Sequence, residues 1–161
     1  MARKLIFGAA LTLATFSIIS GANGENPRIF TGGYVEIDRH QYYVNATNFI
    51  TKDAARAVCK SLNLELVSFE ERNKWDAINV WAQQYVFDVP WFWIGAERIN
   101  TTSWQWEVSG KHIKDFYWGP GQPDMEAEDS VPVCLSLLLS FTGSGWYDGV
   151  CNRTNNAVFC Q

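Results

Sequence analysis

Four cysteines constrain what this chain can fold into more than any other feature of its sequence. They are Cys59, Cys134, Cys151 and Cys160. An even number of cysteines in a secreted chain is typical of disulfides, and four cysteines make two. Zinc is the competing interpretation, but the chain has no Cys-x-x-Cys pair, and His40 and His112 are distant from the cysteines in sequence. Four cysteines allow three pairings, and their spacing does not choose among them.

Residues 1–24 are typical of a secretory signal peptide. Two basic residues precede an apolar run over residues 5–19, and small residues follow it. Such a segment is removed from the mature protein, here after Ala22 or after Gly24. The apolar run is shorter than the ~20 residues that a membrane span needs. We therefore expect a secreted, extracellular protein without a membrane span.

The charge of the chain argues against two classes of partner. Removal of residues 1–24 takes away two basic residues and no acidic ones, so the formal charge moves from −4 to −6. Nucleic acids and anionic membrane surfaces both attract a basic face, and we expect neither as a partner. Three Asn-x-Thr sequons, at Asn45, Asn100 and Asn152, are candidate glycosylation sites and suit the secretory route.

Two helices are predicted in the first half of the mature chain. Thr51 can cap a helix that runs from Lys52 to about Leu62 and carries Cys59. The run Ser68–Glu71 has the pattern of a capping box and predicts the start of a second helix. Apolar residues continue from there at helical spacing as far as Tyr85, and they should face the core.

Strands are predicted before and after these helices. The predicted strand regions are 34–44, read as a hairpin, then 91–94, 104–108, 131–139, 146–150 and 157–160. Residues 25–33 precede them as a short N-terminal arm. Residues 109–130 show little periodicity, and a loop of that length inside a compact domain is typically functional or disordered. The order predicts an α+β domain over residues 34–161.

Four short motifs in this order resemble the C-type lectin domain family. They are Trp93-Ile94-Gly95 after the helices, Gln122-Pro123-Asp124 in the long loop, Trp146-Tyr147-Asp148 after it, and the terminal Phe159-Cys160. The resemblance covers about residues 34–161. It implies two helices flanking antiparallel sheets with a long ligand-binding loop, and it implies the disulfides Cys59–Cys160 and Cys134–Cys151.

The same resemblance implies a calcium ion and a sugar as ligands. In the family, loop and strand side chains hold Ca²⁺, which accepts two vicinal sugar hydroxyls into its oxygen shell. A Gln-Pro-Asp motif resembles the galactose-type variant, in which the proline is cis. The implied ligands of both the ion and the sugar are Gln122, Asp124, Asp148 and one further acid. Glu128 is the first choice for that acid, with Glu126 as the alternative.

Tyr147 supports a second interpretation. It stands where the family pattern has asparagine, and a phenol cannot replace an amide oxygen of that reach. Members of the family without the full set of ligands often bind other molecules without calcium. The alternative function is therefore a calcium-independent C-type lectin-like domain that binds a protein or another non-sugar ligand. No nucleophile motif accompanies the two histidines, so we do not expect an enzyme.

Overall fold

The computed structural model describes residues 28–87, 89–124, 132–140 and 142–161. The predicted hairpin is confirmed as strands β2 (Gly32–Ile37) and β3 (His40–Ile50), which pair antiparallel. The turn between them places Asp38 and Arg39 at φ 48° and 63°. Two residues at positive φ match the right-handed twist of hairpin strands.

Helix α1 (Lys52–Ser61) begins where the sequence predicts. The Thr51 side chain accepts a hydrogen bond from the Ala54 amide and so caps the first turn. Cys59 lies on its buried face, which packs on the C-terminal strand. Lys52 is also buried, although lysine is rarely found inside a protein without a partner.

Helix α2 (Arg72–Ala82) begins later than predicted, and the predicted capping box is wrong. Glu71 is the N-cap residue, and its side chain makes no capping hydrogen bond. The Ser68 hydroxyl instead accepts from Nε2 of Gln161, and the Ser68 amide donates to Oε1 of the same residue, both at 2.9 Å. A partner 93 residues away has taken the atoms that a local cap would use.

Two three-residue strands lie where the sequence predicts none. Strands β1 (Arg28–Phe30) and β4 (Tyr85–Phe87) pair in parallel as a separate small sheet. Tyr85 is therefore a strand residue, and its predicted place in the second helix is wrong. Trp81 of α2 packs on the rings of Phe30 and Phe87, at centroid distances of 5.4 and 5.7 Å. The aromatic contacts hold this small sheet against α2.

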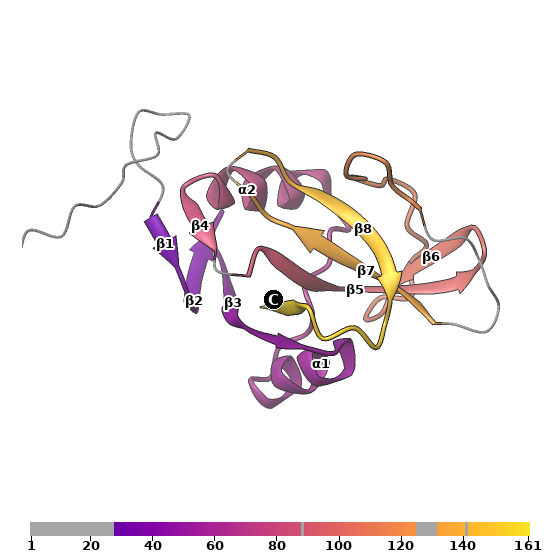
Figure 1. Cartoon of the computed structure of the whole chain (residues 1–161), viewed down its shortest axis with the longest axis horizontal. Coiled ribbons are helices and arrows are strands. Elements are labelled where there is room, and N and C mark those ends of the chain that lie inside the picture. The colour runs from indigo at the N-terminus through magenta and orange to yellow at the C-terminus, as the bar shows by residue number, and fades with distance from the viewer. Residues whose placement is uncertain (1–27, 88, 125–131, 141) are drawn as a thin grey trace, which may run out of the picture.

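The remaining strands form one mixed sheet (Figure 1). They are β5 (Trp91–Asn100), β6 (Ser103–Trp106), β7 (Val133–Leu138), β8 (Gly145–Val150) and β9 (Asn156–Cys160). The order is β2-β3-β9-β5-β7-β8, and β6 pairs with β5 outside this path. Strands β5 and β9 meet in parallel at one pair, Phe92 with Ala157, whereas the other pairs are antiparallel. Strand β8 is the last of the path.

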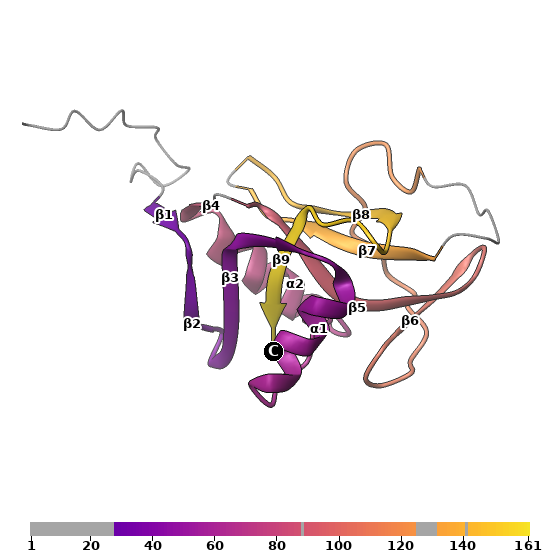
Figure 2. The same cartoon turned by 60° about the horizontal axis from the view of Figure 1, so that its bottom comes forward.

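Two disulfides stabilise this sheet, and the sequence separations of their cysteines differ greatly. Cys59 of α1 bonds Cys160 of β9, and Cys134 of β7 bonds Cys151, which directly follows β8. Both pairings implied by the family resemblance are confirmed. In Figure 2, α1 lies beside the end of β9, while β7 and β8 lie together away from it. Trp146 lies at the centre of the aromatic core. It is fully buried and contacts the rings of Phe69, Trp75 and Trp106.

Candidate functional site

The predicted loop and strand residues meet along the outer edge of β8. The loop runs beside this strand, because the Trp146 amide donates to the Tyr117 carbonyl at 2.7 Å and the Gly119 amide donates to the Trp146 carbonyl at 2.9 Å. The edge of the strand is thereby paired by a loop over this stretch. This pairing brings the Gln122-Pro123-Asp124 segment to the level of Asp148.

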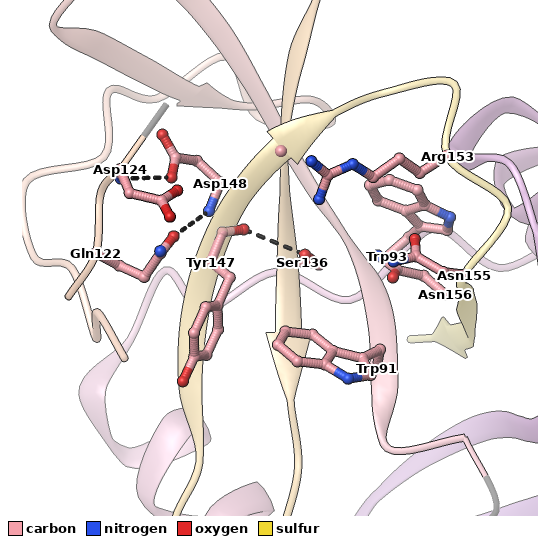
Figure 3. A pocket seen from close by; sticks show the side chains of 11 residues that line it. Trp91, Trp93, Gln122, Asp124, Ser136, Tyr147, Asp148, Arg153, Asn155 and Asn156 are labelled. Atoms are coloured by element: carbon pink, nitrogen blue, oxygen red, sulfur yellow. Dashed lines mark hydrogen bonds between the residues drawn. The ribbon is translucent and has the colours of Figure 1, made fainter. Parts of the chain in front are cut away.

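Two hydrogen bonds then lock Gln122 and Asp124 to Asp148. The Asp148 amide donates to Oε1 of Gln122, and the Asp124 amide donates to Oδ1 of Asp148, both at 3.0 Å (Figure 3). The peptide bond between Gln122 and Pro123 is cis, as the family resemblance implies. Three of the four predicted ligand residues are therefore neighbours, although 24 and 26 residues separate the bonded pairs in sequence.

Glu128, the fourth predicted ligand, and its alternative Glu126 lie outside the described residues. In the ranges that are described, no cluster of three or more His, Cys, Asp or Glu could hold a metal ion. What the described part contributes is two carboxylates and one amide oxygen. Asp148 is 93% buried while Asp124 is exposed, so this oxygen cluster extends from the strand edge to the surface.

The donor chemistry of these residues fits calcium. A carboxylate has about four lone-pair sites and an amide oxygen has two, so oxygens of these types can bind a cation while they also accept hydrogen bonds. Calcium takes six to eight oxygen ligands and tolerates irregular geometry. Gln122, Asp124 and Asp148 would supply the side-chain oxygens of such a site, and the shell would need further oxygens.

Tyr147 points away from this oxygen cluster. Successive side chains of a strand lie on opposite faces, so the phenol cannot lie beside the Asp148 carboxylate. Its ring packs edge-on against Trp91 at 4.8 Å and lies against Gly119. A Cβ atom at position 119 would be 2.3 Å from Cζ of Tyr147, so the absence of a side chain there admits the ring. The Tyr147 phenol is thus excluded as a substitute for the missing amide.

A cavity of about 270 Å³ joins the oxygen cluster to the face of the sheet. Asp124 and Asp148 line one side of it, and Trp91 and Tyr147 line another. Arg153, from the segment between β8 and β9, lines the far side across the strand (Figure 3). Sequence analysis did not single out Arg153, because its position in the cavity depends on how that segment folds back over Gly149.

The three sequon asparagines, all of them described residues, are not among the residues that line this cavity. The side-chain oxygens of Asn45 and Asn100 each accept hydrogen bonds from the amide and hydroxyl of the threonine two residues on. Asn152 is exposed and adjoins Arg153 in sequence. Over the described part of the chain, no helix has the length and apolar character needed to cross a membrane.

Comparison with known proteins matches the part of the chain that contains this site. The family model described as the Lectin C-type domain matches residues 50–161. Among solved structures, the C-type lectin domain of murine dendritic cell inhibitory receptor 2, in complex with an N-glycan, superposes with a TM-score of 0.63 at 19% identity. That match covers 79% of this chain and 93% of the murine domain.

Two further structures have the same fold. The human scavenger receptor C-type lectin carbohydrate-recognition domain matches with a TM-score of 0.60 at 23% identity, over 79% of this chain and 93% of that domain. The cow carbohydrate-recognition domain of CD23, in the presence of a GlcNAc2Man3 oligosaccharide, gives 0.59 at 20% identity, over 79% and 90%. The two helices, the mixed sheet and both disulfides thus form a C-type lectin fold.

Proposed function

The chain belongs to the C-type lectin domain family, and on that premise we propose that it is a secreted protein that binds glycans with terminal galactose-type sugars through calcium. The observation that carries this proposal is the pair of hydrogen bonds that joins Gln122 and Asp124 to Asp148. Two loop side chains and one strand side chain lie together there and present oxygen atoms that would serve as ligands. Relatives of the same fold were solved with an N-glycan and with an oligosaccharide, which supports a glycan as the class of ligand.

Each residue of the cluster has a separate role in this proposal. Asp148 is held from two sides and would provide a buried, fixed carboxylate for the ion. Asp124 would provide an exposed carboxylate that contacts both the ion and a sugar hydroxyl. Gln122 would provide the amide group that distinguishes galactose-type from mannose-type recognition in the family pattern. Bound calcium supplies the attraction for two vicinal hydroxyls that neutral side chains lack in water.

Retention on immobilised galactose tests this proposal. The purified protein should bind the resin in calcium and elute with a chelator. Asp124→Ala should abolish retention, because the loss of one carboxylate lowers calcium affinity and removes a sugar contact. The side chain of Asp124 is exposed, so its loss should leave thermal stability in chelator unchanged. Asp115→Ala, which removes an exposed carboxylate outside the cavity, is the matched control and should be retained.

A calcium-independent interaction domain is the second candidate function. The observation that favours it is the orientation of Tyr147, which leaves the oxygen cluster without the amide oxygen of the family pattern. Under this alternative the melting temperature should be the same with calcium and with chelator. If calorimetry at millimolar calcium gives no binding heat, the sugar proposal is abandoned and a protein or another non-sugar ligand is sought.

A further inference from the structure

Arg153 presents a cation to the same cavity that contains the oxygen cluster. Its side chain is exposed, and within the described part of the chain no hydrogen bond or ion pair joins its guanidinium to another residue. The guanidinium lies over Gly149, where a Cβ atom would be 3.2 Å from Nη1. Glycine at this position of β8 therefore leaves the space that the guanidinium occupies.

The charges of this cavity are separated along its length. Asp124 and Asp148 lie on one side of β8, and Arg153 lies on the other side (Figure 3). The Ser136 hydroxyl lies between them and donates to the Tyr147 carbonyl at 3.2 Å. A ligand that matches this arrangement has neutral hydroxyls at the acidic end, where an ion could hold them, and a negative group at the basic end.

We propose that the cavity extends the sugar site and that Arg153 binds an anionic substituent of the glycan, either a sulfate ester or a carboxylate. This inference rests on the proposed function. Guanidinium is suited to the role because its planar array of N–H donors matches two oxygens of one anionic group. The exposed amide of Asn155, which also lines the cavity, can donate to the same group.

Calorimetry with three ligands tests the proposal at saturating calcium and low salt. The ligands are methyl galactoside, the same sugar with a sulfate ester at O6, and a galactoside with sialic acid linked through O6. Substitution at O6 leaves the vicinal hydroxyls of galactose free to bind the ion. At least one anionic ligand should bind about three- to tenfold more tightly than the neutral sugar, which is the range for an exposed but bidentate charged contact. The sulfated and sialylated arms identify which anion is preferred.

Three variants isolate the contribution of Arg153. Arg153→Gln should remove the gain for the anionic ligand and leave neutral sugar binding unchanged, while keeping the Asn152 sequon. Arg153→Lys should retain part of the gain, since an ammonium keeps the charge but not the planar fork. Arg39→Gln makes the same exchange at an exposed arginine in the β2–β3 turn and should leave all affinities unchanged. The gain should also fall as salt increases, because salt screens exposed charges.

The outcomes separate this inference from the proposed function. If the neutral sugar binds and neither anionic sugar binds more tightly, the anion subsite is refuted and the lectin site stands. Persistence of the gain in Arg153→Gln also refutes the subsite. If none of the three ligands binds, both the proposed function and this inference fail.

Discussion

Lys52 shows how one residue at the start of a helix can connect distant parts of the fold. Only 3% of its side chain is exposed, and its ammonium group donates to the Ala96 carbonyl and forms an ion pair with Glu107 at 2.6 Å. Arg56, one turn later in α1, donates to both oxygens of the same carboxylate at 3.0 and 3.1 Å. Glu107 thus joins α1 to the end of β6. The sequence predicts the helix here but gives no signal that this lysine is buried.

Removal of Glu107 should cost more stability than removal of Lys52. Glu107→Gln leaves a nearly inaccessible ammonium without its counter-charge, and breaking a buried pair in this way typically costs about 3–5 kcal/mol. Lys52→Met keeps the volume and leaves Glu107 paired with Arg56, so we expect a loss of under ~1.5 kcal/mol. Urea unfolding of both variants measures the difference. Equal losses would show that the Lys52–Glu107 pair does not behave as a buried ion pair.

Glu107 also makes stability depend on pH. Burial raises the pKa of this carboxyl, but the hydrogen bond from Arg56 and the charge of Lys52 outweigh it and hold the pKa below its ordinary value of 4.5. A carboxyl whose pKa is lower in the folded state adds stability above its unfolded pKa, and this stability is lost as pH falls through the folded pKa. Unfolding free energies between pH 7 and pH 3 should therefore decline below about pH 4.5. The decline should be shallower in Glu107→Gln, and an unchanged slope would contradict this assignment.

At the scale of single elements, the two helices offer a matched test of capping. Thr51 accepts the Ala54 amide at 3.3 Å, whereas the Glu71 side chain makes no such bond at the start of α2. Thr51→Ala should therefore cost about 1 kcal/mol, the usual value for a lost N-cap. Glu71→Ala should cost less than ~0.5 kcal/mol, as is typical of a surface substitution. Urea unfolding compares the two, and a larger loss from Glu71→Ala would refute the assigned caps.

The elements that the sequence predicts are those whose signals are local. Apolar residues at helical spacing and the Thr51 cap predict α1, and a loosely alternating run and a short apolar run predict the hairpin and the start of β5. Strand β3 continues to Ile50 and β5 to Asn100, beyond the predicted ends at residues 44 and 94. Strands β1 and β4 are three residues long, too short for any periodicity to show. The start of α2 could not be predicted from Ser68, since its hydroxyl bonds Gln161 at the other end of the chain.

The candidate site, too, could be predicted only where its sequence signals are local. Gln122, Asp124 and Asp148 could be selected because short motifs mark them and the family resemblance orders them. Their mutual hydrogen bonds depend on a loop pairing with the edge of β8, which no local pattern encodes. Arg153 was missed for a similar reason, because its place in the cavity depends on a glycine four residues earlier and on residues from four strands, β5, β7, β8 and β9.

At the scale of the whole molecule, the two disulfides stabilise different parts of the fold. Cys59–Cys160 closes a sequence separation of 101 residues and ties α1 to β9, in the same buried cluster as Ala55 and Trp93. Cys134–Cys151 closes only 17 residues and ties β7 to the end of β8. Strands β7 and β8 are already paired over six residues, from Val133 with Val150 to Leu138 with Gly145. The long disulfide therefore constrains the unfolded chain most, and the short one constrains the strand that carries Asp148.

Replacement of each disulfide by two alanines should separate these two effects. In the chain-entropy model the loss of Cys59–Cys160 costs about 4–5 kcal/mol and the loss of Cys134–Cys151 about 3 kcal/mol. Urea unfolding measures these losses. Hydrogen exchange under native conditions should show the reverse order at the site. Relative to the exchange expected from global unfolding of each variant, the Asp148 amide should exchange faster without Cys134–Cys151 than without Cys59–Cys160. This is expected because opening of the β8 end exposes its edge, whereas loss of the long disulfide acts on the unfolded state. Equal protection of Asp148 in both variants would mean that the loop segment with Gln122 and Asp124, and not the short disulfide, holds the strand edge in place.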